Sequence, residues 1–116
     1  MKRLLLDENL PRQLKSHFSA EFEVLTVPDL GWQSKKNGEL LTAIDDEGIQ
    51  YLLTADRNLR FQQNLDKYAL IVVVLILFDT RLKTIAPFVA DIESGILNAE
   101  QSSKIIEIDM RTKMTE

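Results

Sequence analysis

Two runs of apolar residues constrain the fold of this chain more than any other feature. They lie at residues 3–6 (RLLL) and at residues 69–78 (ALIVVVLILF). A run that is apolar almost throughout, rather than alternately apolar and polar, is typical of a strand that helices cover on both faces. The longer run is about half of the ~20 residues that a helix needs to span a membrane. Both runs therefore predict buried strands of a parallel sheet, and no membrane contact is expected.

Strand-like and helix-like segments alternate along the rest of the chain. Further strands are predicted at residues 21–27, 49–54 and 104–108, the last as an edge strand. Helices are predicted over residues 9–19, 37–48 and 80–96, with a short helix or ordered loop over residues 56–65. This alternation predicts an α/β fold, a doubly wound parallel sheet of about five strands in three layers with right-handed crossovers.

Caps and breakers set the predicted helix boundaries. Asn9 and Asn37 are expected to cap the first two helices, and Gly48 to end the second. Pro87 is expected to interrupt the third helix. The segment between the second strand and the second helix, residues 28–36, is predicted to be a loop.

The composition is that of an ordinary globular domain. The chain has 116 residues, a formal net charge of −4 and no cysteine. We therefore expect one domain over residues 1–116, with residues 110–116 as a frayed tail, and no disulfide or thiolate metal site. No targeting segment is visible, so a cytoplasmic location is expected. Because the chain is acidic, any binding to nucleic acid requires a local basic patch or metal ions.

Acidic residues follow three of the predicted strands. Asp7, Asp56 and Asp79 stand after the first, third and fourth strands, and Glu39 stands in the first turn of the second helix. In a parallel sheet all of these positions lie along the carboxyl edge, where open α/β folds place their ligands. Carboxylates that crowd together repel one another unless they share a proton or bind a cation, and oxygen-only clusters suit Mg²⁺ or Mn²⁺. The pattern predicts a metal site.

Each acid also has a purely structural interpretation. Glu39 would stabilise the helix dipole, and Asp79 would cap the helix that follows it, which is the interpretation we favour for Asp79. Asp56 could begin a turn, and Asp7 could be an ordinary loop acid. What favours a site at Asp7 and Asp56 is that each follows an apolar strand almost directly.

Three segments resemble a known family. They are RLLLDENLPRQL at residues 3–14, DLGWQSKKNGELL at residues 29–41 and YLLTADRNLRFQQNL at residues 51–65. Together they resemble the PIN-like family of small bacterial proteins, relatives of the PIN-domain ribonucleases that act as toxins of toxin–antitoxin pairs. The resemblance implies that Asp7, Glu39 and Asp56 are the catalytic acids and hold Mg²⁺ or Mn²⁺. It also implies an RNA substrate, with a protein antitoxin and a second copy of the chain as candidate partners.

One position departs from the family pattern. Many PIN domains have a second acid two residues after the third metal ligand, and here that position is Asn58. Asparagine offers an oxygen but no charge, so a second metal ion is in doubt. Amides and cations nearby could bind phosphate or bases; the candidate substrate-binding residues are Asn9, Lys36, Asn37, Arg57, Asn58 and Gln62.

Three functions follow from these residues. The first is metal-assisted hydrolysis of an RNA phosphodiester, an endoribonuclease activity in which Arg57 or a lysine helps to neutralise the transition state. The second is a receiver-like phosphoacceptor domain, in which Asp56 accepts a phosphoryl group beside Asp7 and Glu8. The third is a catalytically inactive PIN-like module that only binds its partner, an alternative that Asn58 keeps open.

Overall fold

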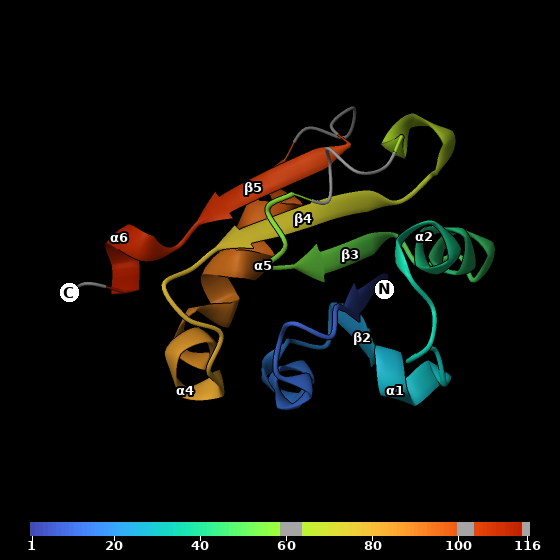
Figure 1. Cartoon of the computed structure of the whole chain (residues 1–116). Coiled ribbons are helices and arrows are strands. Elements are labelled where there is room, and N and C mark those ends of the chain that lie inside the picture. Colours follow the sequence, from blue (N-terminus) through green and yellow to red (C-terminus); the bar gives the residue numbers. More distant parts are fainter. Residues whose placement is uncertain (59–63, 100–103, 115–116) are drawn as a thin grey trace.

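Five parallel strands form one sheet. The computed structural model of the chain describes residues 1–58, 64–99 and 104–114. The strands are β1 (Lys2–Leu6), β2 (Phe22–Thr26), β3 (Tyr51–Thr54), β4 (Ile71–Ile76) and β5 (Ile105–Asp109). They lie in the order β2-β1-β3-β4-β5, and every neighbouring pair is parallel (Figure 1). The predicted five-stranded parallel sheet is confirmed, with β5 at an edge as expected.

Helices cover both faces of this sheet. Leu5, Leu52 and Val72 point to one face and pack with α1 (Val27–Leu30) and α2 (Asn37–Asp46). Leu4, Leu53 and Val73 point to the other face. That face is covered by the 3₁₀ helices η1 (Arg12–His17) and η3 (Ala86–Phe88) and by α4 (Leu82–Ile85) and α5 (Val89–Leu97). The two apolar clusters make the three layers of a doubly wound fold.

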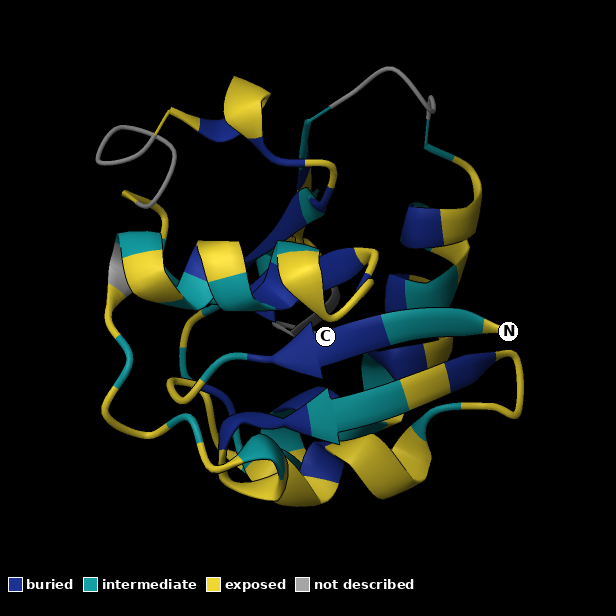
Figure 2. Cartoon of the chain, turned by 90° about the vertical axis from the view of Figure 1, so that its right-hand side faces the viewer, coloured by how far each residue is buried: buried dark blue, intermediate teal, exposed yellow. Residues whose placement is uncertain are grey.

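Strand β1 becomes more buried toward its carboxyl end. Lys2 and Arg3 at the start of β1 are partly exposed, whereas Leu4, Leu5 and Leu6 are buried (Figure 2). Asp7 follows this buried half directly. The Asp7 carboxylate therefore lies at the sheet edge, directly after a strand that is packed on both faces.

Glycine and proline end or interrupt the helices at the predicted positions. Gly48 follows α2 with φ of +76°, a left-handed conformation that glycine adopts without steric cost. Pro87 falls in η3, which separates α4 from α5. Within the predicted segment 56–65, residues 59–63 lie outside the described part, and the 3₁₀ helix η2 (Leu65–Lys67) follows.

Several local predictions are wrong. The first helix is the 3₁₀ helix η1, whose N-cap position is Pro11 rather than Asn9. The N-cap position of α2 is Lys36, which makes no side-chain capping bond, so Asn37 is not the cap. Helix α1 begins at the last residue of the predicted strand and continues into the predicted loop, because Thr26 and Asp29 form a reciprocal capping box.

The predicted frayed tail is also wrong over part of its length. Met110 is buried, and Arg111 donates hydrogen bonds to Asp109 from both its backbone and its side chain. These contacts anchor the short helix α6 (Arg111–Met114) to the end of β5. Over the described residues, no helix is both long and apolar enough to cross a membrane.

The strand order fixes where a ligand is expected. The connection that leaves β1 passes through η1 on one face, and the connection that enters β3 passes through α2 on the other face. The carboxyl ends of β1 and β3 therefore flank the point where the winding reverses. In open α/β sheets ligands bind outside the carboxyl ends of the strands at this point.

Candidate functional site

A single buried hydroxyl group joins the ends of β1 and β3. Thr54, the last residue of β3, is fully buried. Its Oγ1 donates a hydrogen bond of 2.7 Å to Oδ2 of Asp7. The same oxygen accepts hydrogen bonds from Asn9 Nδ2 at 3.1 Å and from the backbone N–H of Asp56 at 3.0 Å. Thr54 thus links the turn that follows β1 to the turn that follows β3.

The carboxylate of Asp7 is held in one orientation. Besides Thr54, it accepts hydrogen bonds from the backbone N–H of Glu8 at 2.8 Å and from Asn9 Nδ2 at 3.4 Å. Its own backbone N–H donates to the carbonyl of Leu53 at 2.9 Å. Asn9 in turn accepts a hydrogen bond from Ala55. Asn9 therefore forms hydrogen bonds that connect the two turns of the site instead of capping a helix. Packing and hydrogen bonds fix Asp7 before any ligand binds.

Asp56 presents an oxygen that no described donor uses. Its Oδ1 accepts a hydrogen bond from the backbone N–H of Asn58 at 2.9 Å. Among the described residues, none donates to Oδ2, and no basic side chain lies within ion-pair distance of Asp56 or of Asp7. Both side chains are only partly buried. Two carboxylates therefore face the solvent at this edge without an ion pair to any cation in the described part of the chain.

The acids at the ends of the other strands are compensated. Asp79, after β4, accepts hydrogen bonds from the backbone and guanidinium of Arg81. Asp109, at the end of β5, is bound in the same way by Arg111. These bonds lower the pKa of each carboxyl group to about 2. Asp29, after β2, pairs with Lys15, whose hydrogen bond lowers the Asp29 pKa.

Asp79 differs in detail from the favoured prediction. Helix α4 has Arg81 at its N-cap position, and no side chain caps it there. Asp79 instead closes a local turn onto the residue two places ahead, as Asp109 does with Arg111. These two acids act in local structure, which separates them from Asp7 and Asp56.

The low pKa values predict part of the acid sensitivity of the fold. A carboxyl group whose pKa is lower in the folded state stabilises the fold above its unfolded pKa, and that contribution is lost as the pH falls through the folded value. For Asp79 and Asp109 the window runs from about 4 down to about 2. We expect the double variant Asp79→Asn, Asp109→Asn to lose less stability across this window than the wild type. Urea denaturation at a series of pH values measures this, and parallel curves would contradict it.

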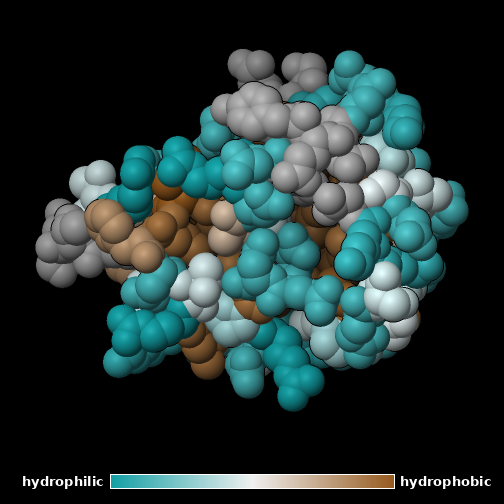
Figure 3. All heavy atoms as spheres, viewed as in Figure 1, coloured by the Kyte–Doolittle hydropathy of each residue, from teal (hydrophilic) through white to brown (hydrophobic). Residues whose placement is uncertain are grey.

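Asp7 and Asp56 line one pocket of about 230 Å³. Glu8, Lys35 and Lys36 are also in its wall, and Leu40, Leu41 and Leu52 contribute apolar atoms. The pocket thus combines three acids, two lysines and an apolar base at the reversal point of the sheet. Hydrophilic side chains cover most of the molecular face seen in Figure 3.

The structure does not bring Glu39 into this pocket. Glu39 is exposed and lines a neighbouring cavity with Thr42, Ala43 and Asp46. Within the described residues, no group of three or more histidine or acidic side chains is placed to hold a metal ion. The structure therefore brings together two of the three predicted acids.

The predicted substrate-binding residues are divided in the same way. Asn9 and Lys36 belong to the site. Asn58 contributes its backbone N–H to Asp56, and the charge of Arg57 acts on Asp109, whose pKa it helps to lower after the larger effect of Arg111. Gln62 and the Asn37 side chain lie outside the described part.

Thr54 was not predicted as a site residue, and Glu8 was predicted as one only for the receiver-like alternative. The sequence does carry a signal for Thr54, because a polar residue ends an otherwise apolar strand two positions before an aspartate. Glu8 is the second acid of the first strand end and lines the pocket directly.

The chain matches no protein-family model, and no curated protein or solved structure matches it. The geometry of the pocket and the physical chemistry of its residues therefore carry the functional argument.

Proposed function

We propose that the chain is a Mg²⁺- or Mn²⁺-dependent ribonuclease whose site is the pocket between Asp7 and Asp56. The observation that supports this most is the contrast among the strand-end acids. Asp29, Asp79 and Asp109 are paired with cations, whereas Asp7 and Asp56 share one pocket and have no such partner in the described residues. Two such carboxylates repel each other, and a bound metal ion would supply the positive charge that offsets this repulsion.

The donor set fits a magnesium-type ion. Carboxylate oxygens are hard ligands, and Mg²⁺ is usually held by one or two carboxylates together with waters and substrate phosphates. Asp7 and Asp56 meet that requirement, and Glu39 has no role in the proposal because it lines the neighbouring cavity. A bound ion would lower the pKa of its water and offset charge on the attacked phosphoryl group.

The residues of the chain have separate tasks in this proposal. Thr54 and Asn9 hold the Asp7 carboxylate in place, so that no reorganisation is needed when substrate arrives. Asp56 offers its second oxygen to the ion. Lys35 and Lys36 attract the phosphate backbone, which the net charge of −4 would otherwise repel.

A cleavage assay tests the proposal. Purified protein should degrade single-stranded RNA when Mg²⁺ or Mn²⁺ is present, stop when a chelator is added in excess, and resume when the ion is restored. Full activity in chelator would overturn the metal-dependent mechanism. RNA binding without cleavage would favour the inactive binding module.

The toxin role and the cytoplasmic location extend the proposal. Both rest on the resemblance to PIN-like toxins, and the partner would then be a protein antitoxin. An adjacent reading frame that encodes a small protein with a DNA-binding motif would support this pairing.

The strand order is also compatible with the receiver-like alternative. It places Asp7 and Glu8 after β1 beside Asp56 after β3, as a phosphoacceptor site requires. Against it, the cation that follows β5 is Arg111, and this arginine is bound to Asp109. Incubation with acetyl phosphate and Mg²⁺ followed by mass spectrometry separates the two, because only the receiver-like domain would carry a phosphoryl group on Asp56.

A further inference from the structure

A second pocket adjoins the first across the Asp7–Glu8 turn. It has a volume of about 210 Å³, and Asp7 and Glu8 line both pockets. The first pocket opens toward β3 and α2, where Leu52 and Leu41 lie. The second opens on the other side of β1, toward β2, α1 and η1. A polymeric ligand that crosses this turn could place one unit in each pocket.

The second pocket is apolar at its base and fixed in shape. Leu6, Leu10 and Val27 line it and are each at least 96% buried, with exposures of 1%, 4% and 1%. Its wall at the end of β2 is held by the capping box between Thr26 and Asp29. Lys15 on η1 pairs with Asp29 at 2.7 Å and ties η1 to α1. The pocket is therefore largely formed before a ligand binds, as small-molecule sites usually are.

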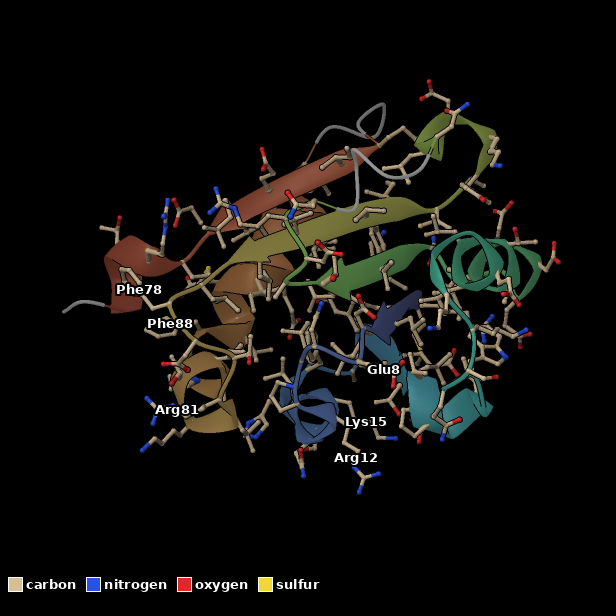
Figure 4. The ribbon with its side chains drawn as sticks, in the orientation of Figure 1. Glu8, Arg12, Lys15, Phe78, Arg81 and Phe88 are labelled. Atoms are coloured by element: carbon tan, nitrogen blue, oxygen red, sulfur yellow. The ribbon has the colours of Figure 1, made fainter. Side chains whose placement is uncertain are left out.

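The rim of this pocket carries one cation and two acids. Arg12 and Glu8 are exposed, and among the described residues neither side chain has a hydrogen-bond or ion-pair partner. Figure 4 shows Glu8 at the end of β1 and Arg12 and Lys15 on the neighbouring η1 segment, on the same side of the molecule. With Asp7 counted, the carboxylates outnumber the arginine. A phosphate would be repelled here, whereas a neutral planar group with both donors and acceptors would not.

The size of the pocket limits what it can hold. Sites for drug-sized ligands have volumes of roughly 300 to 1,000 Å³. A volume of about 210 Å³ lies below that range and suits a single ring system rather than a whole nucleotide. A flipped-out nucleobase packs its ring faces on apolar or planar side chains and forms hydrogen bonds through its edges, and this pocket offers apolar side chains at its base and polar groups at its rim.

We infer that this second pocket is a subsite for an unpaired guanine base, next to the phosphate-binding pocket between Asp7 and Asp56. The inference rests on the proposed function. Guanine offers two acceptors, O6 and N7, that match a bidentate arginine. Its N1–H and exocyclic amino group form a donor pair that matches the carboxylate of Glu8. Adenine, cytosine and uracil each lack this combination, so Arg12 and Glu8 together select guanine.

Two measurements on one set of substrates test the inference. Single-stranded oligoribonucleotides that differ at one central base are bound to the protein without metal and followed by fluorescence anisotropy, and are then cleaved with Mn²⁺ and mapped. We expect guanine to be preferred by about tenfold or more, since a bidentate pair discriminates to that degree. Arg12→Met and Glu8→Gln should each remove most of this preference. Lys83→Met and Glu21→Gln, matched changes of exposed residues elsewhere, should retain it.

The outcomes separate the subsite from the nuclease proposal. Equal binding and cleavage of all four bases by the wild type would overturn the subsite and leave the nuclease proposal standing. Guanine-dependent binding that Arg12→Met removes, without cleavage, would support the subsite and overturn the nuclease proposal. Neither binding nor cleavage of any RNA would overturn both.

Discussion

Replacing Asp7 with asparagine should lower the rate of metal-dependent RNA cleavage by more than about 100-fold. Changing a group that only supports a metal ligand typically costs roughly 10- to 100-fold, and Asp7 is proposed as a ligand itself. Asparagine keeps the shape of the side chain and can still accept a hydrogen bond from Thr54. The loss would therefore report the missing charge rather than a disordered turn. Initial rates with a fluorogenic oligoribonucleotide measure it.

Asp79→Asn is the matched control for this experiment. It makes the same substitution at the same edge of the sheet, but at an acid that Arg81 compensates. We expect Asp79→Asn to retain the wild-type rate. Equal losses in the two variants would mean that the edge as a whole, rather than the Asp7 and Asp56 pocket, supports activity.

Metal binding gives a second readout that does not depend on catalysis. An ion bound only by the folded state at 100 times its dissociation constant stabilises the fold by roughly 2.7 kcal/mol. The wild type and Asp79→Asn should show this shift in melting curves with Mn²⁺, and Asp7→Asn should lose most of it. If Asp7→Asn shows the full shift, Asp7 does not bind the ion.

The sheet could be predicted from the sequence because its signal is local and strong. Continuous apolar runs such as residues 69–78 leave little choice but a strand buried on both faces. The end of such a run also marks where a strand stops, which is why Asp7 and Asp56 were placed at the carboxyl edge correctly. The order of the strands has no comparable local signal, because it depends on which apolar faces pack together.

Glu39 shows how a correct topology can still misplace a side chain. Helix α2 does begin near the carboxyl edge. An α-helix completes one turn every 3.6 residues, however, so neighbouring residues point in different directions. Lys36 and Leu40, four residues apart, share the stripe that lines the Asp7 pocket. Glu39 lies on another stripe with Thr42 and Asp46. The rotation of α2 about its own axis relative to the sheet decides which of its residues face the Asp7 pocket. The sequence of the helix alone does not reveal this rotation.

The asparagines were misassigned for a related reason. A short amide side chain suits a helix cap and a tertiary hydrogen bond equally well. Asn9 precedes a helical segment, which favoured a cap. In the structure its amide instead reaches Thr54 and Ala55, 45 and 46 residues further along the chain. Such a contact becomes visible only when β1 and β3 are placed side by side.

Replacing Thr54 with valine should destabilise the fold by roughly 1 to 3 kcal/mol. Valine has nearly the same shape, so packing around this fully buried residue changes little. The hydroxyl is lost, however, and with it the hydrogen bonds to Asp7, to Asn9 and to the backbone N–H of Asp56. The melting temperature should fall by about 4 °C or more in a domain of this size. Thermal unfolding without metal measures it.

Two controls and one cycle identify the cause of this loss. Thr54→Ser keeps the hydroxyl and should recover most of the stability, and Thr42→Val, on the exposed side of α2, should be nearly neutral. In a double-mutant cycle, Thr54→Val and Asp7→Ala should be less than additive by roughly 0.5 to 3 kcal/mol, because each removes one partner of the same hydrogen bond. Strict additivity would show that the hydroxyl and the carboxylate act independently. A coupled pair would mean instead that the buried Thr54 hydroxyl holds the Asp7 carboxylate in position at the edge of the sheet.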